Sequence, residues 1–128
     1  MNEKILQTEF SRKYRPETSE VHELKITKTG RLSFSCLRGK QESKLSKIDS
    51  PRGCYHKLSD MSADYKPFDS FFLISVPAYI VACWYKPKKP KILYFIRIKD
   101  FLALRDTSKW ASMTEEEAKL ICEKTLEL

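Results

Sequence analysis

The stretch Glu20–Thr27 has the sequence EVHELKIT, and its alternation decides how the rest of the chain is arranged. Successive side chains of a β-strand point to opposite faces, so a strand here places Glu23 and Lys25 on one face and Leu24 and Ile26 on the other. The two aliphatic side chains require a core. A carboxylate and an ammonium beside that core are costly unless they have partners or a chemical role. The stretch therefore predicts a strand with candidate functional residues on its polar face.

The composition is typical of a soluble globular protein. The chain has 128 residues, of which 41% are hydrophobic and 32% charged, and its length suits one domain with one core. No apolar run approaches the roughly 20 residues that a membrane-spanning helix needs. We therefore expect a single domain over residues 1–128 and no membrane partner.

The four cysteines indicate a reducing environment. They stand far apart and form no CxxC pair, which argues against a zinc site. Cys83 lies in an apolar run and Cys122 on the apolar side of an expected helix, so both suit small core residues without disulfides. These features predict a cytoplasmic protein.

The net charge of +7 favours a polyanionic partner, most often nucleic acid. A basic turn over residues 86–91, stiffened by two prolines, adjoins Trp84 and Tyr85. Cations beside aromatic rings suit a nucleic-acid backbone with some base stacking. The alternative is a solvated hairpin tip. The candidate nucleic-acid contacts are Lys86, Lys88, Lys89, Lys91, Lys66, Arg38 and Lys40.

Hydrophobic periodicity predicts an α/β domain with a mixed central sheet flanked by helices. The near-continuous apolar runs 68–74 and 78–85 are typical of central strands covered on both faces. Thr114 and Glu117 form a capping box at the start of a C-terminal helix. The other expected elements are helices over 4–14, 36–48 and 100–104 and strands over 20–27, 54–58 and 92–98.

A few polar residues interrupt these apolar elements and are candidate site residues. Glu23 and Lys25 share a strand face, and Asp69 is the only ionisable side chain in the run 68–74. Gln41 places an amide on a mostly apolar helix face, where it either bonds the backbone or points into a site. Glu9 is either a solvated helix charge or a residue at the border of the buried face.

The order of these segments resembles the PD-(D/E)xK nuclease superfamily, and within it the Holliday junction resolvases of the RecU type. The resemblance is carried by a short acidic helix, the Glu-x-Lys strand, the segment Ser33-Phe34-Ser35 followed by Leu37, and a helix bearing Gln41. It implies a restriction-endonuclease-like fold. It also implies that Glu23 binds metal with Leu24 beside it, that Lys25 is catalytic, and that Glu9 matches the acid of the first helix.

One feature of that family is missing from its usual place. The first metal-binding aspartate normally lies on a strand before the Glu-x-Lys strand, yet residues 13–22 contain no aspartate. The best substitute is Asp69, which would reach the site from a later strand and so requires a rearranged strand order. Asp60 and Asp64 are alternatives for this role, and the competing interpretation is that they are ordinary loop acids.

Two carboxylates suit Mg²⁺ or Mn²⁺, which prefer oxygen ligands. Such a metal polarises a phosphate and lowers the pKa of an attacking water, and Lys25 would stabilise the developing charge. We therefore expect a magnesium-dependent endonuclease acting on DNA, including Holliday junctions in recombination, as a homodimer with two identical sites. The competing interpretation is a non-catalytic nucleic-acid-binding module in which Glu23 and Lys25 form only an ion pair.

Overall fold

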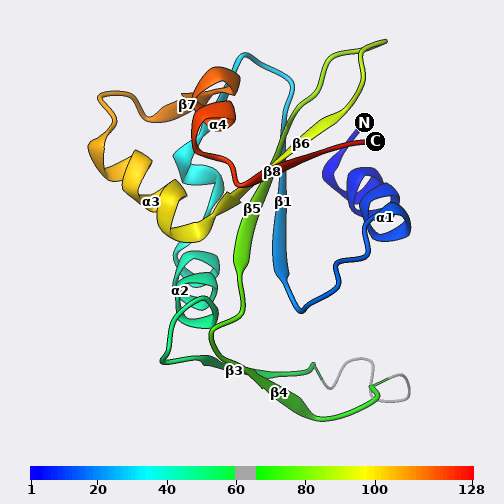
Figure 1. The fold of residues 1–128 in the computed structure, drawn as a ribbon, viewed down its shortest axis with the longest axis vertical. Coiled ribbons are helices and arrows are strands. Elements are labelled where there is room, and N and C mark those ends of the chain that lie inside the picture. The colour runs from blue at the N-terminus through cyan, green and yellow to red at the C-terminus, as the bar shows by residue number, and fades with distance from the viewer. Residues whose placement is uncertain (60–65) are drawn as a thin grey trace.

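A four-stranded mixed sheet forms the centre of the computed structural model, which describes residues 1–59 and 66–128 (Figure 1). Its strand order is β1-β5-β6-β8. β1 (Val21–Thr27) runs parallel to β5 (Ala78–Trp84), whereas β6 (Ile92–Arg97) is antiparallel to both β5 and β8 (Lys124–Glu127). The parallel pair brings the polar face of β1 beside the most buried strand of the protein.

Four α-helices and two small antiparallel ribbons surround this sheet in the described part of the chain. One ribbon joins β2 (Arg31–Ser33) to β7 (Ser112–Thr114), and the other joins β3 (Cys54–Lys57) to β4 (Ser70–Leu73). The helices are α1 (Glu3–Lys13), α2 (Gly39–Ile48), α3 (Ile98–Thr107) and α4 (Glu115–Ile121), with a 3₁₀ turn η1 (Phe34–Cys36).

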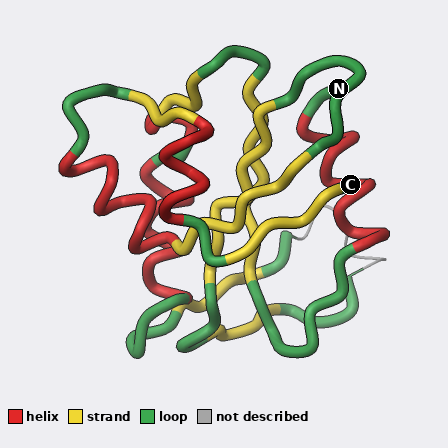
Figure 2. Tube along the Cα trace, turned by 45° about the horizontal axis from the view of Figure 1, so that its top comes forward, coloured by secondary structure: helices red, strands yellow, loops and turns green. Residues whose placement is uncertain are grey.

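The sheet separates two hydrophobic cores. On one face, Leu6 and Phe10 of α1 pack against Leu24 and its neighbours. On the other face, α2, α3 and α4 pack against the opposite side chains of β5 and β6. Figures 1 and 2 show α1 on one side of the sheet and the three other helices on the other. Glu23 and Lys25 alternate with Leu24, so both lie on the α2 face.

Most of the helices and strands that local sequence patterns predict are confirmed. The expected helix 4–14, the strands at 20–27, 54–58, 78–85 and 92–98, and the capping box of Thr114 and Glu117 are all present within a residue or two. Every residue of β5 is buried, which agrees with a central strand covered on both faces. None of the described helices combines the length and apolar character needed to cross a membrane.

One expectation about the elements is wrong, and two expected helices are present with different bounds. The run 68–74 is not a central strand, because β4 pairs with β3 in a separate ribbon that buries only one face. The helix expected at 36–48 begins later, at Gly39, because residues 34–36 form a separate 3₁₀ turn that Ser33 caps. The helix expected at 100–104 is longer, and it spans the whole of α3.

Candidate functional site

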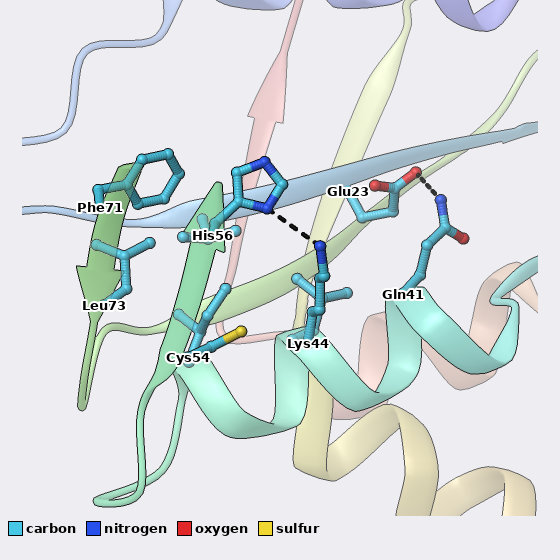
Figure 3. A pocket seen from close by; sticks show the side chains of 10 residues that line it. Glu23, Gln41, Lys44, Cys54, His56, Phe71 and Leu73 are labelled. Carbon is cyan, nitrogen blue, oxygen red and sulfur yellow. Dashed lines mark hydrogen bonds between the residues drawn. The ribbon is translucent and has the colours of Figure 1, made fainter. Parts of the chain in front are cut away.

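Glu23, Lys25 and Gln41 form a hydrogen-bonded cluster between β1 and the start of α2. Lys25 Nζ lies 3.4 Å from Glu23 Oε1 and 3.5 Å from Gln41 Oε1. Gln41 Nε2 donates to Glu23 Oε1 over 3.1 Å, and Figure 3 shows the amide pointing from α2 toward the carboxylate. Three residues that sequence analysis singled out, from two segments, therefore meet at one place.

The start of α2 holds Gln41 in this position. Gln41 is the third residue of the helix, and its Oε1 accepts a hydrogen bond from the backbone N–H of Arg38 at the N-cap over 3.4 Å. This contact is the side-chain half of a capping box, which ties the amide to the helix terminus. The Gln41 side chain is thus both a cap and a bridge to the polar face of β1.

Lys25 is largely buried, with 9% of its surface exposed. An ammonium removed from water is costly unless it is paired and hydrogen-bonded. Glu23 supplies the opposite charge and remains partly exposed. The pair therefore has one largely buried member and one partly exposed member that lines the neighbouring cavity.

A cavity of about 300 Å³ lies beside this cluster, between β1, α2 and the β3–β4 ribbon. Its wall is largely apolar, with a few polar groups from different elements, which is typical of a small-molecule or substrate site. Lys44 Nζ and His56 Nδ1 are joined by a hydrogen bond of 3.1 Å at the cavity wall (Figure 3). The lining residues are Val21, Glu23, Gln41, Lys44, Leu45, Ile48, Cys54, His56, Phe71 and Leu73.

Asp69 lies just before β4 and next to the cavity wall in the sequence. Its carbonyl accepts from the N–H of Leu58 over 2.8 Å, which extends the β3–β4 ladder by one pair. Alternation then puts Asp69 on the same ribbon face as Phe71, which lines the cavity. The carboxylate itself is 89% exposed and pairs with Lys66 at 3.2 Å. Asp69 is not one of the cavity-lining residues, so the described contacts do not join it to Glu23.

Glu9 and the Leu24 side chain lie on the opposite face of the sheet. Glu9 belongs to α1 and is bound by Lys91 Nζ at 2.7 Å, and this hydrogen bond lowers the pKa of the Glu9 carboxyl. Leu24 packs in the core beneath α1, so only its backbone could serve a metal on the α2 side. Asp60 and Asp64 lie outside the described residues.

The basic candidates are spread over three parts of the surface. Lys86, Lys88 and Lys89 are exposed on the β5–β6 turn, where Lys88 adopts a positive φ of 63°. Arg38 and Lys40 are exposed at the start of α2, three residues and one residue before Gln41 respectively. Lys91 and Lys66 are engaged by Glu9 and Asp69.

Sequence analysis missed Lys44 and His56. A signal for each was present, because Lys44 lies three residues after Gln41 on the same helix stripe and His56 alternates with the buried Cys54. Neither position could be connected to the other without the tertiary structure, since twelve residues separate them.

The donor set fits a divalent metal only in part. Mg²⁺ is commonly held by one or two carboxylates together with waters and substrate oxygens, and Glu23 provides one such carboxylate beside the cavity. Within residues 1–59 and 66–128, however, no group of three or more His, Cys, Asp or Glu side chains is arranged to hold a metal ion. Asp69 would have to leave Lys66 to act as the second carboxylate.

Comparisons with protein-family models, with curated proteins and with solved structures find no match to this chain.

Proposed function

We propose that this protein is a metal-dependent endonuclease that hydrolyses DNA phosphodiester bonds. The observation that carries the proposal is the meeting of Glu23, Lys25 and Gln41 beside a cavity on one face of the sheet. A buried ammonium held against a carboxylate suits a site where negative charge develops on a phosphate. The net charge of +7 would favour the encounter with a polyanion.

Each residue of the cluster has a separate role in this proposal. Glu23 and Asp69 would hold Mg²⁺ or Mn²⁺, and a bound ion would polarise the scissile phosphate and lower the pKa of the attacking water. Lys25 would donate to a phosphate oxygen. Gln41 would keep the Glu23 carboxylate in place through its Nε2 hydrogen bond.

A finer fold assignment belongs to the same proposal. A restriction-endonuclease-like core with rearranged strand order would take its second acid from the end of the β3–β4 ribbon, after the Glu-x-Lys strand. The position of Asp69 on the cavity-facing side of that ribbon supports this arrangement. Cutting both strands of a branched junction would further require two identical sites, and hence a homodimer.

The second candidate function is a non-catalytic nucleic-acid-binding module. Two contacts favour it: Glu23 Oε1 already meets both Lys25 and Gln41, and Asp69 already pairs with Lys66. In this case the Glu23–Lys25 pair would serve only the fold. The exposed cations of the β5–β6 turn would then hold phosphates.

A cleavage assay separates the two functions. Linear, nicked and four-way DNA are incubated with and without Mg²⁺, using the wild type, Lys25→Met and Asp69→Asn. The controls are Lys119→Met and Asp106→Asn, which make the same charge changes at exposed, ion-paired positions on other elements. We expect Mg²⁺-dependent cutting that falls about 100-fold or more in the two site variants and is unchanged in the controls.

Tight, salt-sensitive binding without cutting in any divalent metal would instead establish the binding module. Cutting that survives Lys25→Met would exclude the cluster as the catalytic site.

A further inference from the structure

The β3–β4 ribbon has two faces with different surroundings. Its inner side chains line the cavity, whereas Tyr55 and Phe72 point away from it. These two aromatic residues are direct cross-strand partners, and they are 62% and 55% exposed. Figure 1 shows the ribbon at the edge of the molecule, apart from the central sheet. An exposed aromatic pair on a two-stranded ribbon is typical of a binding surface.

The backbone beneath Phe72 holds its ring in place. Gly53 has a φ of +76°, and a Cβ built on it would lie 2.5 Å from Cζ of Phe72. The ring therefore lies against the glycine backbone, in space that no other residue type leaves free. The Phe72 ring is exposed but already fixed against Gly53, so little side-chain conformational entropy is lost when a ligand covers it.

The charges around the aromatic pair identify the class of partner. Lys57 shares the outer face with Tyr55 by alternation, and Arg52 precedes Gly53; both are exposed. Neither cation has an ion-pair partner among the described residues. The ribbon segments 52–57 and 70–74 contain no acidic residue. Aromatic rings beside free cations suit a ligand with flat π-faces and negative charge, which describes single-stranded nucleic acid.

We propose that the outer face of the β3–β4 ribbon binds single-stranded nucleic acid, with unpaired bases stacked on Tyr55 and Phe72 and phosphates held by Arg52 and Lys57. For the nuclease proposed above, this surface identifies single-stranded nucleic acid as the substrate class, and to that extent the inference rests on the proposed function. The ribbon would hold an unpaired strand on one face and contribute to the cavity with the other.

Binding is measured in EDTA, where metal-dependent cutting cannot occur. The probe is a labelled oligothymidylate of about 15 nucleotides, compared by fluorescence anisotropy with a duplex of equal length. We expect tighter binding of the single strand, and a loss of about 10-fold or more in Tyr55→Ala and in Phe72→Ala. Tyr55→Phe should bind as the wild type does, because stacking uses the ring and not the hydroxyl.

Two controls separate stacking from other effects. Leu120→Ala removes another exposed apolar side chain, on α4, and should leave the affinity unchanged. Lys57→Met should reduce the slope of log affinity against log salt by about 0.7, whereas Tyr55→Ala should leave that slope unchanged. Because Phe72→Ala could loosen the ribbon, Tyr55→Ala is the deciding variant.

Wild-type affinity in Tyr55→Ala would overturn the proposal. So would a dimer in sedimentation that Tyr55→Ala converts to a monomer, because a second copy would then cover this face. If no metal supports cutting but Tyr55-dependent binding persists, the nuclease fails and this inference stands. If cutting occurs and Tyr55→Ala binds normally, only this inference fails.

Discussion

Two carboxylate–lysine clusters lie at β1 and the residue before it, one on each face of the sheet, and they are built differently. On the α2 face, Glu23 meets Lys25 and Gln41 beside a cavity. On the α1 face, Glu20 Oε2 accepts from Lys124 Nζ over 2.8 Å. The residue types are alike, so the chemistry of the pair alone does not separate a site from a structural contact.

The Glu20 cluster is closed by rings and hydrogen bonds. Lys124 Nζ lies 5.1–5.2 Å from the ring centroids of Tyr14, Tyr79 and Phe95, a distance at which cation–π attraction is effective. The Glu20 carboxylate also contacts His22 at 2.9 Å. Both oxygens of the Glu20 carboxylate have protein partners, so the cluster is suited to joining the end of α1, β1 and β8.

The Glu23 cluster differs in access. Its carboxylate is more exposed than that of Glu20, and the cavity brings Lys44 and His56 to the same place. Each pair has one largely buried partner, but in the Glu20 cluster that partner is the carboxylate. In the Glu23 cluster the carboxylate is the more accessible partner and lines a cavity, which makes it the candidate site. Substitutions on the two faces should therefore separate activity from stability.

The largest expected effect is on activity, from the double substitution Glu23→Gln with Lys25→Met. Cutting should fall by about 100-fold or more, because the variant would lose both a metal-holding carboxylate and the ammonium that would contact the phosphate. The free energy of unfolding in urea should stay equal or rise, since replacing a whole buried ion pair by neutral residues is often neutral or stabilising. A loss of several kcal/mol would show that this cluster is structural, like its counterpart.

The next effect is on stability, from Glu20→Gln. The Glu20 side chain is 8% exposed, and its removal leaves Lys124 without its carboxylate. We expect the free energy of unfolding to fall by about 1–3 kcal/mol, with cutting retained. Glu116→Gln breaks a fully solvated pair and should change that free energy by less than about 0.5 kcal/mol. Equal losses of unfolding free energy in Glu20→Gln and Glu116→Gln would show that the Glu20 cluster stabilises the fold no more than an exposed ion pair does.

The smallest effect is on the pH dependence of stability. Burial by itself raises the pKa of the Glu20 carboxyl, but hydrogen bonds from Lys124, His22 and Tyr14 outweigh it, and the net pKa lies below the ordinary value of 4.5. A lowered pKa stabilises the fold above the unfolded value and loses that contribution as pH falls through the folded value.

Urea unfolding from pH 6 down to about pH 2 tests this expectation. The wild type and Glu20→Gln should differ most at the upper end and converge at the lower end, because the wild-type carboxyl is then protonated and resembles the amide. A constant gap over the whole range would mean that the Glu20 charge contributes nothing.

Local patterns were sufficient for much of the fold. The alternation of residues 20–27 identified both faces of β1, and the uninterrupted apolar run at 78–85 identified the buried strand β5. The pairing of Glu23 with Lys25 follows from the same alternation, since residues two apart in a strand share a face. Each of these features depends on neighbours within a few residues.

Long-range packing decided the rest. The run 68–74 is as apolar as a central strand, yet pairing with β3 left Phe72 at the surface. Gln41 could have bonded only backbone, and it reached Glu23 because α2 begins at Gly39 and lies beside β1. The pairing of β8 with β6 placed Lys124 among aromatic rings from the end of α1, from β5 and from β6. Hydrophobic pattern states that a face is buried but not by which element, so only the tertiary structure determined which charged residues were enclosed and which border a cavity.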